Sequence, residues 1–133
     1  MNDFLVADTN IVSYIFKKDT RGDLYKPHLE NRVAVTAAQT LAELELMPLQ
    51  NGWGEKRHAA LRVNLKNYIF IETTEETCLQ WAKIRFEARR NGKPVSVGDA
   101  WIAATALAYS IPLVTHNYDD FKNISGLQII NER

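Results

Sequence analysis

Four acidic residues stand at positions where a metal-dependent site for phosphodiester cleavage could be built. Asp8 directly follows an apolar, strand-like segment and precedes a helical pattern, so its carboxylate would lie where a strand ends and a helix begins. Glu43 falls within an early helical pattern, Asp99 precedes a late one, and Asp120 comes after a late strand-like segment. Open α/β sheets place their functional groups outside the carboxyl ends of the strands. If the four carboxylates meet there, we expect a magnesium or manganese site.

Carboxylates that gather at one place repel each other unless a cation lies between them. Two of them about 4 Å apart repel by roughly 4 kcal/mol at an effective dielectric constant near 20. A hard divalent cation removes this cost, and an octahedral ion keeps several waters, one of which can act as the nucleophile. The three histidines are scattered, so no spacing favours zinc. The single cysteine, Cys78, has no histidine near it in the sequence, and we expect a buried, unreactive thiol.

Each acid also has an ordinary structural explanation. Asp8 and Asp99 could be N-caps of the helices that follow them, which would stabilise each helix by about 1 kcal/mol. Asp120 could lie in a surface turn. Glu43 is inside a helical pattern and is not explained by capping, although helical periodicity does not separate it from Glu45. The combination of four acids near strand ends and helix starts favours the functional interpretation.

Strand-like and helical patterns alternate along the chain, which predicts an α/β fold. The predicted strands are residues 4–7, 33–36, 68–71, 113–115 and 127–130. The predicted helices are residues 9–16, about 23–30, 37–47, 55–67, 74–91 and 100–109. Thr36 is expected to cap the third helix, which Pro48 closes or kinks. The last helix carries no charge and should be buried on most sides. Such a chain forms a mostly parallel sheet of about five strands with helices on both faces.

Length and composition predict one domain, residues 1–133, of ordinary globular type. The chain is 46% hydrophobic and 24% charged, and no apolar segment approaches the roughly 20 residues of a membrane span. The first residues lack the pattern of a secretion signal, so we expect a cytoplasmic protein with no membrane partner. The charge is balanced, with 16 basic and 16 acidic residues, which disfavours nonspecific coating of nucleic acid. A basic segment, residues 83–93, could still contact phosphates or form a solvated helix face.

Four segments of the chain resemble motifs of the PIN-domain family, and more closely of its VapC-type toxin branch. They are residues 7–10, 40–44, 98–107 and 115–121, and their order and spacing run across nearly the whole chain. The resemblance implies an endoribonuclease that depends on Mg²⁺ or Mn²⁺. It places the catalytic and metal-binding acids at Asp8, Glu43, Asp99 and Asp120, with Asp120 preferred to Asp119 because it stands in an Asn-x-x-Asp-Phe pattern. One departure is that Leu46 and the residues after it replace the small residue or glycine that often follows the family's glutamate.

The resemblance also implies substrate contacts and partners. Thr9, Thr115 and Asn117 match polar positions that would line the site and bind RNA. The implied partners are a second copy of the chain, forming a homodimer with a shared groove, and a small antitoxin protein whose extended segment blocks that groove. A PIN-like nuclease used in RNA processing without an antitoxin is an alternative. A receiver-type phosphoacceptor module is a weaker one, because that reading needs an aspartate at the end of the third strand, where Glu72 and Thr73 stand.

Overall fold

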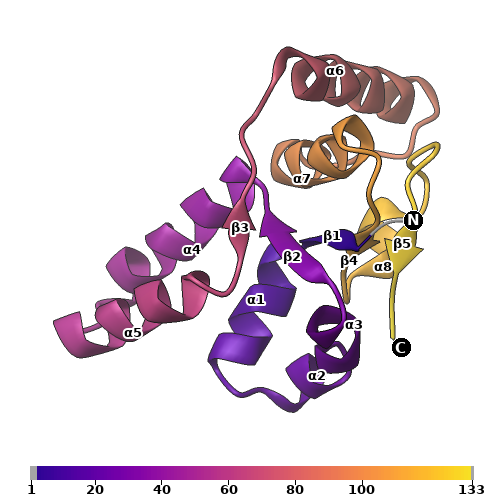
Figure 1. Ribbon diagram of the computed structural model, residues 1–133. Helices are drawn as coiled ribbons and strands as arrows, with labels where there is room; N and C mark the ends of the chain where they lie inside the picture. The colour runs from indigo at the N-terminus through magenta and orange to yellow at the C-terminus, as the bar shows by residue number, and fades with distance from the viewer. Residues whose placement is uncertain (1–2, 133) are drawn as a thin grey trace.

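The computed structural model describes residues 3–132 as a five-stranded sheet with helices packed on both of its faces (Figure 1). The strands are β1 (Phe4–Ala7), β2 (Val33–Thr36), β3 (Ile69–Phe70), β4 (Leu113–Val114) and β5 (Ile129–Ile130). The helices are α1 (Thr9–Phe16), α2 (Thr20–Asp23), α3 (Lys26–Glu30), α4 (Ala38–Asn51), α5 (Glu55–Leu65), α6 (Glu75–Arg90), α7 (Val97–Ala108) and α8 (Tyr118–Phe121). No helix among the described residues is both long enough and apolar enough to cross a membrane.

The sheet has the order β3-β2-β1-β4-β5, and all of its neighbouring strands are parallel. This confirms the predicted parallel α/β sheet. The order differs from the 2-1-3-4-5 order of receiver modules, so the fold argues against that alternative. The chain adds strands on one side of β1 and then, with β4, on the other side. Ligand sites of open α/β sheets lie at such a reversal, outside the carboxyl ends of the strands, and Asp8 and Thr115 directly follow the two strands that flank it.

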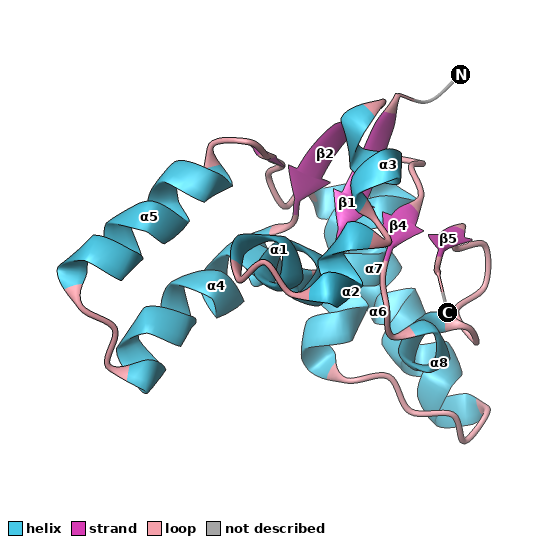
Figure 2. Cartoon of the chain, turned by 90° about the horizontal axis from the view of Figure 1, so that it is seen from below, coloured by secondary structure: helices cyan, strands magenta, loops and turns pink. Residues whose placement is uncertain are grey.

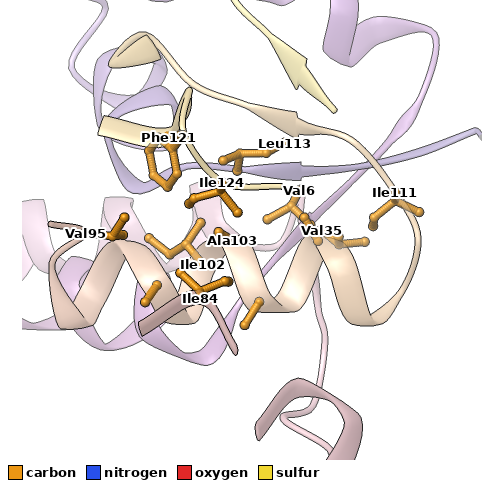
Figure 3. Close-up of a cluster of buried hydrophobic side chains, with 13 residues drawn as sticks. Val6, Val35, Ile84, Val95, Ile102, Ala103, Ile111, Leu113, Phe121 and Ile124 are labelled. Carbon is orange, nitrogen blue, oxygen red and sulfur yellow. The ribbon is translucent and has the colours of Figure 1, made fainter. Parts of the chain in front are cut away.

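Alternate residues of the strands face two separate hydrophobic cores. Val6, Val35 and Leu113 point toward α6 and α7, where they join Ile102 and Phe121 in one buried cluster (Figure 3). Their neighbours Leu5, Ala34 and Val114 belong to the cluster on the opposite face, with residues of α1 and α4. Both sides of each strand are therefore buried, which is why these segments read as continuous apolar runs in the sequence.

Helix α7 lies between the sheet and α6, as the absence of charge in its sequence predicts (Figure 1). Its alanines at positions 100, 103, 104 and 106 and Ile102 are almost completely buried. The helix begins earlier than predicted, at Val97, and its N-cap is Ser96, whose hydroxyl accepts a hydrogen bond from the Asp99 N–H at 3.1 Å. Asp99 therefore lies in the first turn of the helix and is not its N-cap.

The predicted N-cap of α4 is wrong, and of the two roles considered for Pro48, closing the helix is excluded. Thr36 ends β2 as a buried residue, and Ala37 is the N-cap position, without a capping side chain. The helix also continues through Pro48 to Asn51 and ends at Gly52, which adopts the left-handed conformation with φ 62°. Pro48 removes only one hydrogen bond, because the carbonyl of Leu44 loses its amide donor while the following turn is still formed. A further difference is that two short helices, α2 and α3, replace the single helix predicted over about residues 23–30.

Helix α6 has the predicted extent, but Cys78, which was expected to be buried, does not lie on its buried face. Thr77 and Ile84 are buried against α7 and the sheet, whereas Cys78 is exposed. Leu79 and Phe86, on the outer side, are 53% and 65% exposed. The expected buried thiol is wrong because a rotation of 100° between successive helical residues separates Cys78 from the buried position next to it.

Helices α4 and α5 form a hairpin that projects from one side of the molecule (Figures 1 and 2). Glu45 of α4 is 3.1 Å from His58 of α5, which holds the two helices together. Leu49 and Val63 on this hairpin are 74% and 63% exposed. The hairpin therefore presents apolar side chains to solvent far from either core.

The buried side chain of Tyr25 links the residues after β5 to the end of β4 through its hydroxyl group. Tyr25 is fully buried, and its hydroxyl lies 2.7 Å from His116 Nδ1 and accepts a hydrogen bond from the Glu132 N–H at 3.1 Å. Asn131 donates to the carbonyl of Thr115 at 2.9 Å. The end of β4 and the residues after β5 are thereby held side by side.

Replacing Tyr25 by phenylalanine is expected to lower the free energy of unfolding by about 1–3 kcal/mol, because buried polar groups lose their partner. Tyr109→Phe is the matched control: its hydroxyl donates to the Glu72 carbonyl at 2.9 Å, but the side chain is 39% exposed and water can replace the lost bond. The control should cost less than about 1 kcal/mol. Urea denaturation of both variants measures the difference. If both variants lost the same free energy of unfolding, the proposed role of Tyr25 in holding the C-terminal residues against β4 would be contradicted.

Candidate active site

Asp8 is the most buried of the predicted acids. It leaves β1 as the N-cap of α1, and its side chain is 4% exposed. One carboxylate oxygen accepts the Thr9 N–H at 2.7 Å, and the other accepts the Thr115 hydroxyl at 2.7 Å. Asp8 therefore caps α1, the role considered from the sequence. Each carboxylate oxygen accepts one of these hydrogen bonds and keeps further acceptor capacity, so the residue can cap the helix and also bind a ligand.

The environment of Asp8 disfavours its negative charge. The pKa of this carboxyl is raised from 3.8 to about 6, mainly by burial and in part by the charges of Asp99 and Glu43, while the hydrogen bonds from Thr115 and Thr9 oppose the rise. A carboxylate that is desolvated next to like charges gains from a neighbouring cation. The direction of the pKa shift is therefore consistent with a residue that would bind a cation.

Asp99 interacts electrostatically with all three of the other acids. Burial raises its pKa, the charges of Asp120 and Glu43 raise it as well, and a hydrogen bond from Ser96 opposes the rise. Asp8 in turn has its pKa raised by Asp99. The four predicted acids are therefore brought to one end of the sheet, with Asp99 as their common neighbour.

Glu43 is held by neighbours on two helices. The Thr9 hydroxyl donates to Glu43 Oε1, and the Gln39 amide donates to Glu43 Oε2 at 3.1 Å. Gly98 on α7 leaves room for this arrangement, since a Cβ there would lie 3.1 Å from Gln39 Nε2 and 3.3 Å from Glu43 Oε2. The glutamate thus lies between α4 and the first turn of α7, on the side where Asp99 stands.

The structure distinguishes the members of two pairs of neighbouring acids, Glu43 from Glu45 and Asp119 from Asp120. Glu45 points toward α5, where His58 and Arg62 lie 3.1 Å and 3.9 Å from its carboxylate oxygens. Glu43 is therefore the glutamate of this helix that lies beside the other acids. Asp119 is 3.2 Å from Lys122 and exposed, whereas the exposed Asp120 acts on the pKa of Asp99.

The three predicted substrate-contacting residues lie beside these acids. Thr115 is fully buried, and its hydroxyl donates to Asp8 and accepts the Asn117 N–H at 3.0 Å. Thr9 contacts Glu43 and lies 3.1 Å from the Thr40 hydroxyl. Asn117 is half-buried at the start of α8. In the structure the two threonines orient the carboxylates.

The donor set suits a hard divalent cation, although the side chains are not gathered around one point. Carboxylate oxygens are the ligands that Mg²⁺ and Mn²⁺ prefer. Within residues 3–132, no group of three or more acidic, histidine or cysteine side chains is close enough to hold an ion as it stands.

Three supporting residues were not predicted from the sequence. Ser96 had a signal, because Ser-x-x-Asp before an apolar segment is typical of a helix N-terminus. Gly98 could have been noted as a glycine inside a helical pattern, which often marks close packing. Gln39 stands four residues before Glu43, the spacing of neighbours on a helix face. Each signal is local and indicates helix geometry, so none of them alone points to a site.

Comparisons with known proteins identify relatives of the chain over nearly its whole length. A family model described as the PIN domain matches residues 5–127. Ribonuclease VapC1 of Haemophilus influenzae (strain R2866) is 28% identical over 129 residues, which cover 92% of this chain and 93% of the relative. The structure of VapBC-1 from nontypeable Haemophilus influenzae is 27% identical with a TM-score of 0.84, covering 96% of this chain and 97% of that chain. A member of the VapBC family of toxin-antitoxin systems, VapBC-5 from Mycobacterium tuberculosis, shares the fold with a TM-score of 0.68 at 22% identity, covering 98% of both chains.

The raised pKa of Asp8 predicts an unusual dependence of stability on pH in metal-free protein. The folded state holds this proton more tightly than the unfolded state, so the contribution of Asp8 is favourable below about pH 4 and is lost as the pH rises through about 6. The unfolding free energy of the wild type minus that of Asp8→Asn should therefore fall by up to about 3 kcal/mol between pH 4 and pH 7. Urea denaturation with a chelator present measures this difference.

Asp23→Asn is the control, since Asp23 is exposed on α2 and pairs only with Lys26 at 3.1 Å. Its difference from the wild type should stay within about 0.5 kcal/mol over the same pH range. If the difference in unfolding free energy between the wild type and Asp8→Asn also stayed constant with pH, the energetic cost of burying the charged Asp8 carboxylate would be contradicted.

Proposed function

The chain belongs to the PIN-domain family, and we propose that it is a metal-dependent endoribonuclease that acts as the toxin of a toxin–antitoxin pair. A relative that matches nearly its full length is named a ribonuclease, and structures of VapBC proteins share its fold. The observation that carries the chemical part is the set of four acids with Asp99 as their common neighbour, at the reversal of the sheet. We take residues 1–133 as one nuclease domain that works in the cytoplasm.

Within this proposal, Asp8 and Asp99 hold a magnesium or manganese ion, and Glu43 and Asp120 orient its waters or help to hold a second ion. When bound, the ion polarises the phosphoryl oxygens and lowers the pKa of a bound water. The protein contributes placement and charge. Thr9 and Thr115 fix the orientations of Glu43 and Asp8 through hydrogen bonds.

RNA itself would be positioned by the polar rim of the site. Thr9 and Asn117 have polar side chains next to the acids, where a phosphate or a ribose hydroxyl can be hydrogen-bonded. Attack by water leaves a 5′-phosphate and a 3′-hydroxyl, because the ribose 2′-hydroxyl takes no part. Without a cation the acids repel the phosphate, so binding and cleavage of RNA both require the ion.

Two exposed apolar surfaces supply places for the proposed protein partners, a second copy of the chain and a small antitoxin. One is the α4–α5 hairpin with Leu49 and Val63, and the other is the outer side of α6 with Leu79 and Phe86. Contiguous exposed apolar side chains on a protein surface commonly mark interaction sites. An antitoxin arginine inserted among the carboxylates would form charge-assisted hydrogen bonds and exclude the ion.

The nuclease proposal predicts that Asp99→Asn lowers Mn²⁺-dependent cleavage of single-stranded RNA at least about 100-fold, because loss of a metal-binding carboxylate removes several kcal/mol of transition-state stabilisation. Asp120→Asn should also lower it, by a smaller factor. Asp119→Asn is the matched control, since this neighbouring acid pairs with Lys122, and it should keep wild-type activity.

Thermal unfolding of the same metal-free variants distinguishes a chemical role from a structural one. Asp99→Asn should melt at the same temperature as the wild type or higher, because one of several mutually repelling charges is removed. A lower melting temperature together with weakened cleavage would instead indicate that Asp99 stabilises the fold. If Asp119→Asn lost as much cleavage activity as Asp120→Asn, the choice of Asp120 over Asp119 as the metal-site aspartate would be contradicted.

The toxin role predicts arrest of growth when the chain is expressed alone in its native host. We expect an adjacent upstream reading frame to encode a short DNA-binding protein, and co-expression of that protein should restore growth. Expression of Asp99→Asn at the same level, checked by immunoblotting, should be harmless. Harmless expression of the wild type would contradict the toxin role and favour a PIN-like nuclease of RNA processing. It would not contradict the nuclease proposal, because RNA cleavage is assayed without the antitoxin.

A further inference from the structure

We propose that a hollow beside the acids binds the base of a nucleotide next to the scissile phosphate, an inference that rests on the proposed ribonuclease function. The hollow lies between the start of α4 and the side of α7 and has a volume of about 270 Å³. Its lining residues are Ala38, Gln39, Ala42, Thr73, Trp101 and Thr105. This set is called the base hollow below. Its size suits one planar ring system, since pockets for drug-sized ligands begin at about 300 Å³.

The base hollow adjoins the acids through Gln39. This residue lines the hollow, and its amide also donates to Glu43 Oε2 at 3.1 Å. Gly98 stands against both side chains, and any Cβ at that position would press on the Gln39 amide. An RNA strand with one phosphate at the acids therefore has a neighbouring base within reach of the hollow. Continuity with the catalytic site favours a nucleotide of the substrate as the occupant.

The wall of the base hollow offers an aromatic ring that is already fixed in place. Trp101 stacks on Trp81, with 5.0 Å between ring centroids and an angle of 19° between the ring planes. The Thr105 hydroxyl donates to the Trp101 carbonyl at 2.8 Å, one turn along α7. Bases of single-stranded RNA bind proteins by stacking on such rings. Ala38 and Ala42 add apolar surface without filling the space.

Gln39 gives the hollow a hydrogen-bond acceptor for the base. Because a carboxylate only accepts hydrogen bonds, the Gln39 group facing Glu43 must be the NH₂ group, and the carbonyl oxygen Oε1 remains for a ligand. This oxygen can accept a hydrogen bond from the exocyclic amino group of adenine, cytosine or guanine or from the N3–H of uracil. We therefore expect the hollow to bind a base without strong preference among the four.

The test uses a protein variant in which a larger side chain fills the base hollow, together with RNA substrates that lack one base. Ala42 is exposed on α4, so Ala42→Leu fills the hollow without disturbing a core. Gln128→Leu, at an exposed position just before β5 and away from the hollow, is the control, since leucine has nearly the volume of glutamine. Wild type and both variants cleave short single-stranded RNAs with Mn²⁺, each RNA carrying an abasic residue at one position near the cut. Sedimentation velocity reports the oligomeric state of each protein, and Mn²⁺ binding is measured by calorimetry.

With the wild type, an abasic residue at one position next to the cut should raise KM roughly 5- to 100-fold, the loss expected from one base–aromatic stack. Ala42→Leu should raise KM for intact RNA by a similar factor, show no further effect of the abasic residue, and bind Mn²⁺ with unchanged affinity. Gln128→Leu should match the wild type throughout. Trp101→Phe, which keeps an aromatic ring, should retain part of the effect and so separates loss of stacking from loss of folding.

Three results would overturn the base hollow. Ala42→Leu could keep the wild-type KM, or abasic residues could have no effect at any position while intact RNA is cleaved. Ala42→Leu could also change the sedimentation coefficient without changing KM, which would show that a second copy of the chain covers the hollow. Failure of the wild type to cleave any RNA would refute the ribonuclease itself, and the base hollow with it, so the two failures are distinguishable.

Discussion

The structure depends on how the fold accommodates the buried carboxylate of Asp8 at the end of the central strand β1. Asp8 is nearly inaccessible to water, and the carboxylates of Asp99 and Glu43 raise the free energy of its charged form. Hydrogen bonds from Thr9 and Thr115 offset part of this cost. So does the positive end of α1, at which Asp8 is the N-cap. The remaining electrostatic cost of the charged Asp8 side chain is what the divalent cation of the proposed nuclease would offset.

The sequence pattern predicts which segments are strands and helices better than it predicts where they end. The five strands and the parallel sheet follow from apolar segments that alternate with helical patterns, because burial on both faces leaves a strong signal. Helix ends depend on single hydrogen bonds. Ser96 and Asp99 are both good N-cap residues, and only the path of the chain into α7 decides that Ser96 is used. Similarly, Pro48 is compatible with a helix end or a helix interior, and packing selects the interior.

The membership of the site was predictable only with the help of the family resemblance. Asp8 and Asp99 stand out because strand ends and helix starts locate them. Glu43 and Glu45 differ by two positions on one helix, and the choice between them depends on the placement of α5, which supplies His58 as a partner for Glu45. The orientation of α6 was equally undetermined, and Cys78 is exposed for that reason. Periodicity indicates that a face is buried, whereas tertiary contacts decide how the helix is rotated.

The hydrogen bond between Asp8 and Thr115 joins residues 107 positions apart in the chain. During synthesis at about 5–20 residues per second, roughly 5–20 s separate the appearance of the two residues at the ribosome. The central strand can pair with β2 early, but its other neighbour, β4, is made much later. A nascent chain therefore holds the carboxylate of Asp8 without the threonine that orients it until the ribosome has added Thr115.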